Sequence, residues 1–120
     1  MRILGVALLA LLTAGCSVDR QAAAARRAVL IEQTILNPAD RDGVFLVFPL
    51  ESGGSIGGLE FVWEPAKISE AKATQIVSEI CRNGGRSGTL AISKDLGTRS
   101  ATTANGSQIV ARDVWYDCVR

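Results

Sequence analysis

Apolar residues recur in the second half of the chain with the spacing of one helical face. Over residues 70–82 they are three or four positions apart, and polar residues occupy the opposite side. Ser69 can cap this helix, and Glu70 suits the positive end of its dipole. Asn83, Gly84 and Gly85 then indicate its end. The predicted buried face comprises Ala73, Ile76, Val77, Ile80 and Cys81.

Four other stretches are typical of β-strands. Residues 44–48 are apolar throughout, which favours a central strand covered on both faces and ended by Pro49. Residues 59–64 alternate between apolar and polar, as do residues 89–93 and 107–119 less strictly. In the last strand, the even positions are expected to face inward. They are Val110, Arg112, Val114, Tyr116 and Cys118.

The order of these elements predicts an α+β fold. We expect a small antiparallel sheet in ββαββ order, with one main helix packed on one face. Residues 51–58 would form a long, flexible, glycine-rich connection between the first two strands, and residues 94–104 are mostly polar. Val47, Val62 and Trp115 would lie on the other face of the sheet, where an exposed apolar patch is expected.

The segment before this domain has two interpretations. Ala24, Ala28, Ile31 and Ile35 recur at helical spacing, which favours a tether followed by a helix. The alternative is a flexible tether to Arg27 followed by a strand over residues 29–36. In either case residues 16–36 join the N-terminus to a domain formed by residues 37–120.

The first sixteen residues have the layout of a secretory signal. Met1 and Arg2 provide a charged start, an apolar run covers residues 3–12, and small residues precede Cys16. The run is too short to cross a bilayer, which requires about 20 apolar residues. Residues 12–16 resemble the lipobox of bacterial lipoproteins. Leu12 lies one position before the usual leucine, and Thr13 takes that position.

This resemblance implies a lipid anchor. Cys16 would receive a diacylglyceryl group, the signal peptide 1–15 would be cleaved between Gly15 and Cys16, and the new amino group would be acylated. Two or more acyl chains hold a protein stably on a membrane. In the family an aspartate after the cysteine favours inner-membrane retention, so Ser17 implies an outer-membrane location, facing the periplasm.

Two cysteines remain for the exported domain. Cys81 lies on the predicted inner face of the helix and Cys118 on that of the last strand, so a disulfide between them is expected in an oxidising compartment. The alternative is a pair of buried free thiols.

The charge is balanced, with 13 Lys and Arg against 12 Asp and Glu, so the chain has no basic footprint for nucleic acid.

Catalytic chemistry finds little support in the sequence. There is no histidine, which removes the usual general base and the commonest zinc ligand. Ser93 and Lys94 have no supporting motif, and the carboxylates at even spacing on strands favour a solvated face. These are Glu60 with Glu64, and Asp113 with Asp117. We therefore expect no enzyme activity, no metal and no cofactor.

The leading functional hypothesis is an interaction or structural module of the cell envelope. It would be held on the membrane by the lipid on Cys16 and would bind another envelope protein. Trp115, Glu51 and Ile56 are the candidate binding surface. The alternative hypothesis is a periplasmic module that binds a small ligand or glycan, which would require a concave pocket.

Overall fold

The computed structural model describes residues 2–120, and it describes side-chain environments from Val18 onward. The predicted α+β class is confirmed, with two helices and one four-stranded antiparallel sheet. The predicted ββαββ order is corrected, because the chain begins with a long helix. The elements are α1 (Arg2–Thr34), a 3-10 turn (Pro38–Asp40), β1 (Val44–Ser52), β2 (Ser55–Trp63), α2 (Glu70–Asn83), β3 (Leu90–Thr102) and β4 (Gln108–Cys118).

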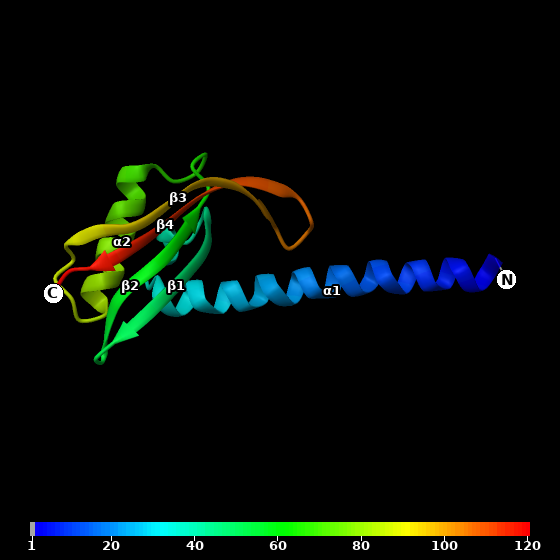
Figure 1. Cartoon of the computed structure of the whole chain (residues 1–120), viewed down its shortest axis with the longest axis horizontal. Helices are drawn as coiled ribbons and strands as arrows, with labels where there is room; N and C mark the ends of the chain where they lie inside the picture. The colour runs from blue at the N-terminus through cyan, green and yellow to red at the C-terminus, as the bar shows by residue number, and fades with distance from the viewer. Residues whose placement is uncertain (1) are drawn as a thin grey trace.

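The sheet has the strand order β1-β2-β4-β3, with α2 packed on one face (Figure 1). The prediction that residues 44–48 form a central strand is therefore wrong, because β1 lies at an edge. Pro49 does not end β1 either; it pairs with Leu59 within the strand. An edge strand tolerates proline because one side of its backbone needs no hydrogen-bonded partner.

The two hairpins differ from their predicted form. β1 and β2 are joined by Gly53 and Gly54 alone, both at positive φ, so the expected long loop over residues 51–58 is mostly strand. In the second hairpin β3 continues to Thr102, through the polar stretch that the predicted strands left out. Antiparallel pairing with β4 satisfies the backbone of this stretch, whatever the polarity of its side chains.

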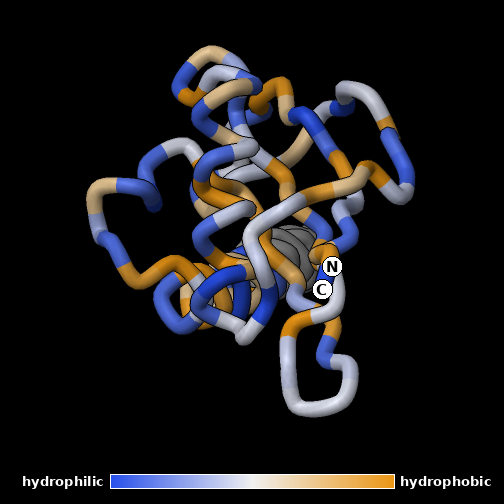
Figure 2. Tube along the Cα trace, turned by 90° about the vertical axis from the view of Figure 1, so that its left-hand side faces the viewer, coloured by the Kyte–Doolittle hydropathy of each residue, from blue (hydrophilic) through white to orange (hydrophobic). Residues whose placement is uncertain are grey.

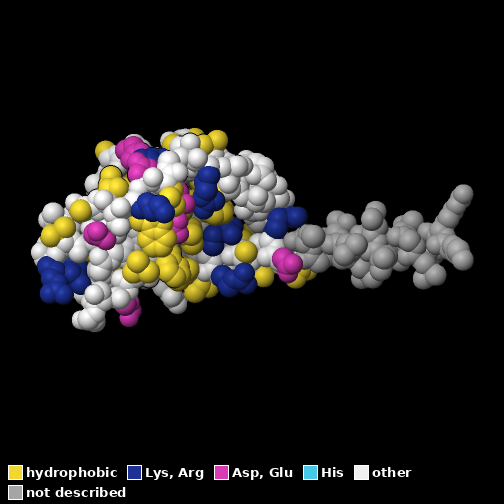
Figure 3. Space-filling view, in the orientation of Figure 1, with side chains coloured by type: hydrophobic (Ala, Val, Ile, Leu, Met, Phe, Trp, Pro, Cys, Tyr) yellow, Lys and Arg dark blue, Asp and Glu magenta, His cyan; other side chains and the backbone are white. Residues whose placement is uncertain are grey.

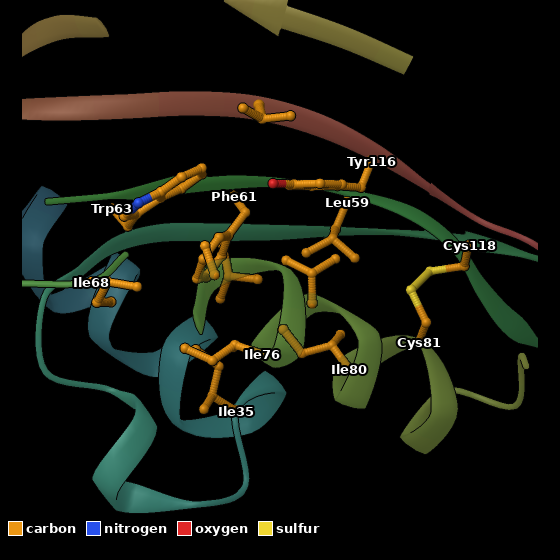
Figure 4. Close-up of a cluster of buried hydrophobic side chains, with 14 residues drawn as sticks. Ile35, Leu59, Phe61, Trp63, Ile68, Ile76, Ile80, Cys81, Tyr116 and Cys118 are labelled. Atoms are coloured by element: carbon orange, nitrogen blue, oxygen red, sulfur yellow. A yellow bond between two sulfur atoms is a disulfide. The ribbon is translucent and has the colours of Figure 1, made fainter. Parts of the chain in front are cut away.

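The main core lies between α2 and the sheet (Figure 4). The N-cap of α2 is confirmed, since the Ser69 side chain accepts a hydrogen bond from the Lys72 amide at 3.1 Å. Phe61 and Trp63 stack with ring centroids 5.3 Å apart. All five predicted inner residues of α2 are buried. On β4, Val114, Tyr116 and Cys118 are buried as predicted, but Val110 is 65% exposed. The buried α2 residues are Ala73, Ile76, Val77, Ile80 and Cys81.

The predicted disulfide between Cys81 and Cys118 is present, with the two Cα atoms 5.6 Å apart. It joins the last turn of α2 to the end of β4. Both cysteines belong to the buried core cluster. Viewed from the end opposite the N-terminus, short hydrophobic and hydrophilic stretches follow one another along the chain trace (Figure 2).

Helix α1 replaces the predicted tether. The chain is helical from Arg2 to Thr34, which agrees with the favoured helical interpretation of the segment around Ala28 and Ile31. The alternative strand over residues 29–36 is wrong, and the helix also extends over the expected tether. Ile35, just after the helix, is buried in the main core, and the Arg27 guanidinium lies 4.1 Å from the centre of the Phe45 ring. Within the part of the chain whose side chains are described, no helix is long and apolar enough to cross a membrane.

Candidate interaction surface on the outer sheet face

The face of the sheet turned away from α2 carries a row of four side chains, one from each strand. Phe48 pairs with Glu60, Glu60 pairs with Trp115, and Trp115 pairs with Lys94. Directly paired residues of neighbouring strands share a face. We call these four residues, Phe48, Glu60, Trp115 and Lys94, the outer row.

Hydrophobic side chains of the outer face are exposed beside charged ones. Phe48 is 45% exposed and the neighbouring Leu50 is 43% exposed, while Trp115 is partly buried. Figure 3 shows this face, with hydrophobic side chains grouped beside Lys or Arg and Asp or Glu side chains. Of the patch residues predicted from the sequence, Trp115 is partly accessible, but Val62 and Val47 are both fully buried.

The reasons for these two burials differ. Val47 pairs with Phe61 and belongs to the main core, on the side of α2. Val62 does face outward, but it forms a second small cluster with Ala101 and Ala111, against which Phe45, Leu46 and Ile109 pack. This cluster lies at the end of the face where Phe45 contacts Arg27 of α1, whereas Phe48 and Leu50 are exposed.

Two carboxyl groups meet on this face. Asp113 is almost completely buried, and its Oδ2 accepts a hydrogen bond from Arg99 Nε at 3.1 Å. Burial raises the pKa of Glu60 to about 7, helped by the side-chain hydrogen bond with Asp113 and by the Asp113 charge, and opposed by Arg99. With Glu60 ionised, Asp113 Oδ1 has no partner. A protonated Glu60 supplies the missing donor.

This pair predicts a pH-dependent stability. A carboxyl whose folded-state pKa exceeds its unfolded value of about 4.3 stabilises the fold when protonated, and this contribution is lost as pH rises through about 7. Solvent screening reduces the effect, so we expect a loss of about 1 kcal/mol between about pH 5 and about pH 8. Chemical denaturation across this range measures it.

The Glu60→Gln variant is expected to remove this pH dependence and to be the more stable protein above pH ~7. Glu51→Gln is the matched control, because Glu51 is an exposed carboxylate near the far end of β1. If Glu60→Gln kept the wild-type pH profile, the carboxyl pair would not be its source.

The candidate binding residues do not form a single surface. Trp115 lies in the outer row, whereas Ile56 packs against the main core and its amide donates to the Gly84 carbonyl at 3.0 Å. Glu51 pairs with Ile56, and both line a small cleft with Ile80 of α2. These two residues are therefore strand positions on the side of α2, and the structure does not bring them together with Trp115.

The carboxyl pair was missed because it depends on strand register. The sequence grouped Glu60 with Glu64 and Asp113 with Asp117, each within one strand. In the structure Glu60 pairs with Trp115 and Val62 with Asp113, which places Glu60 diagonally next to Asp113. One feature of the sequence pointed to a buried carboxyl group. Asp113 lies between Ala111 and Trp115 on one face of the last strand.

Another charged group of the sheet, Arg112 on the interior strand β4, has all its charge compensated by its partners. Arg112 donates to both carboxylate oxygens of Asp95 and, at 2.7 Å, to Glu70 of α2, and its guanidinium lies 5.9 Å from the centre of the Trp63 ring. The hydrogen bond from Arg112 lowers the pKa of Asp95 to about 2. This network joins β3, β4 and α2 and is structural.

The residues considered for lipidation, catalysis and metal binding lie in different parts of the structure. The predicted lipidation site Cys16 and the predicted cleavage position at Gly15 lie within α1, but outside the residues whose side chains are described. Ser93 and Lys94 are both exposed on β3. Among the described residues, no three Cys, Asp or Glu side chains gather as a metal site would require.

In comparisons with known proteins, no family model, curated protein or solved structure matches this chain.

Proposed function

We propose that this chain is a membrane-anchored lipoprotein of the bacterial envelope whose domain binds another envelope protein through the outer row. The lipobox resemblance at residues 12–16 supports the anchor, with the lipid on Cys16 and an outer-membrane, periplasm-facing location. The role is that of a non-enzymatic adaptor, which requires recognition and attachment but no reacting group.

The aromatic side chains of the outer row, the exposed Phe48 and the partly buried Trp115, carry this proposal. Phe48 and Trp115 flank Glu60 on an open sheet face, and aromatic residues dominate the binding energy of protein interfaces. The charges around them favour a particular partner. Arg99 compensates Asp113, and Glu60 is about half protonated near pH 7, which leaves Lys94 as the exposed charge of the row. The partner surface is therefore apolar with an acidic group at its edge.

The alternative function, a small-ligand or glycan-binding module, has less support at this surface. Small molecules bind in concave sites that cover most of their area. The cavities described in the domain are lined by other residues than Trp115 and Phe48. The outer row is an open surface, which suits a protein partner better than a small molecule.

Crosslinking in cells tests the proposed interface. The lipidated protein is crosslinked in the membrane fraction, and co-purifying proteins are identified by mass spectrometry. We expect Trp115→Ala and Phe48→Ala each to reduce recovery of the main partner by at least about tenfold, since hot-spot truncations cost about 2 kcal/mol or more.

Val110→Ala is the matched control, because Val110 is 65% exposed and belongs to the opposite face of β4. It should leave partner recovery unchanged. Melting temperatures of the three variants show whether the fold is intact. Equal partner recovery by all three variants would contradict an interface at the outer row, and recovery of the protein without any partner would contradict the adaptor role.

A further inference from the structure

A cavity of about 590 Å³, open to solvent, is lined in part by the C-terminal residue Arg120. The C-terminus lies at the end of the molecule opposite the N-terminus (Figure 1). It is formed where the β1–β2 turn meets the loop after α2. Its lining combines two arginines, three serines and two glycines and contains no carboxylate side chain. The polar lining residues are Arg86, Arg120, Ser52, Ser55 and Ser87.

Arg86 is held in place within this cavity. Its Nε donates to the Ser55 hydroxyl at 2.7 Å, and its Nη2 donates to the Ser52 carbonyl at 3.4 Å. Ser55 is itself fixed, because its hydroxyl donates to the same Ser52 carbonyl at 3.0 Å. The guanidinium therefore has a defined position before any ligand arrives, which reduces the entropic cost of binding.

The charge of Arg86 has no counterion in the described part of the protein. The ion pairs there involve other basic residues, and none of them includes Arg86 or Arg120. Arg86 is also half-buried, so its charge is only partly solvated. A fixed, partly desolvated guanidinium binds an oxyanion more strongly than a mobile surface arginine does.

The walls leave room for a ligand to approach the backbone. Gly53 and Gly85 line the cavity with φ of +59° and +92°, a conformation that glycine adopts without strain. At Gly53 a Cβ atom would meet no other atom within 4 Å, so the space beside the turn is open. The serine hydroxyls add neutral hydrogen-bonding groups around the two positive charges.

We propose that this cavity is an oxyanion-binding site for a small ligand that carries a single phosphate or carboxylate group. Arg86 would bind the anion through its free donors, Arg120 would add a second positive charge, and Ser87 would lie at the wall. Glu51 and Asp117 line an adjoining groove that shares both arginines, and these carboxylates disfavour a polyanion. The site is separate from the outer row and independent of the protein-docking proposal.

Titration of the full-length protein in detergent micelles, followed by amide NMR, tests this site. Sodium phosphate and sodium acetate are the two probes, at constant ionic strength maintained with sodium chloride. We expect saturable shifts of the Gly85, Arg86 and Ser87 amides with at least one probe. The stronger probe distinguishes a phosphate ligand from a carboxylate ligand.

Arg86→Gln and Arg120→Gln should each weaken this binding by about tenfold, because each removes one charged donor. Arg82→Gln is the matched control, since Arg82 is an exposed arginine of α2 that does not line the cavity. Arg120→Gln keeps the test valid if Arg86→Gln fails to fold, because Arg120 makes no hydrogen bond in the described structure. Non-saturating shifts with both probes, or equal weakening by Arg82→Gln, would overturn the proposal.

Discussion

Replacement of Cys81 by serine is expected to lower the free energy of unfolding by about 4 kcal/mol under oxidising conditions. The disulfide to Cys118 spans 37 residues of sequence, and the loss of loop entropy in the unfolded chain accounts for most of this stabilisation. This amount is a large fraction of the total stability of a small domain. Urea denaturation of variant and wild-type protein measures the difference.

The reducing agent provides the control for this prediction. Reduction should lower the stability of the wild-type protein towards that of Cys81→Ser and leave the variant itself unchanged. Both cysteines are buried, so part of the loss in Cys81→Ser arises from placing a hydroxyl in the core. Cys81→Ala also lacks the disulfide but has no hydroxyl, so the difference in stability between the two variants measures that part. A wild-type protein whose stability is insensitive to complete reduction would show that the disulfide contributes nothing.

Replacement of Cys16 by serine is expected to abolish lipidation and maturation. The lipobox resemblance implies that cleavage follows modification of the thiol, so the variant should accumulate as an unlipidated precursor that keeps residues 1–15. Intact-mass spectrometry detects both the missing acyl chains and the retained residues 1–15. The wild-type protein should lack these residues and carry acyl chains, which anchor it stably because each buried CH₂ adds about 0.8 kcal/mol.

Cys81→Ser serves as the matched control for maturation, because it removes a thiol outside the lipobox. It should be lipidated and cleaved like the wild-type protein. Normal maturation of the Cys16→Ser variant would overturn the prediction of a lipid anchor.

Lipidated protein would retain a helix over residues 16–34, about 28 Å long at 1.5 Å per residue, between the lipid and the core of the domain.

Helix α2 shows what local sequence determines. Its N-cap at Ser69, its first turn at Glu70 and its five buried residues all agree with the prediction. A helix depends on neighbours three and four positions away, so its signals lie within one short segment. The disulfide follows from the same logic, because two independent periodicities place Cys81 and Cys118 on inner faces.

The strands show where local signals are insufficient. The apolar run around Val47 has the composition of a central strand, yet β1 is an edge strand, and its outer side is covered in part by α1, where Arg27 contacts Phe45. The polar residues of the β3 extension give no strand signal, because their backbone is satisfied by β4. Strand position and length depend on partners distant in sequence, which a local pattern does not contain.

The candidate sites, like the strand positions, depend on residues that are distant in the sequence. The sequence by itself determined the class of fold, the helix α2, the cysteine pair and the signal that resembles a lipobox, because each follows from patterns within short segments of the chain. Tertiary structure alone decided that Glu60 meets Asp113, that Phe48 and Trp115 share the outer row, and that Arg86 joins Arg120 at one cavity. These groupings depend on strand register and on the packing of loops, and a shift of one residue would place each side chain on the opposite face.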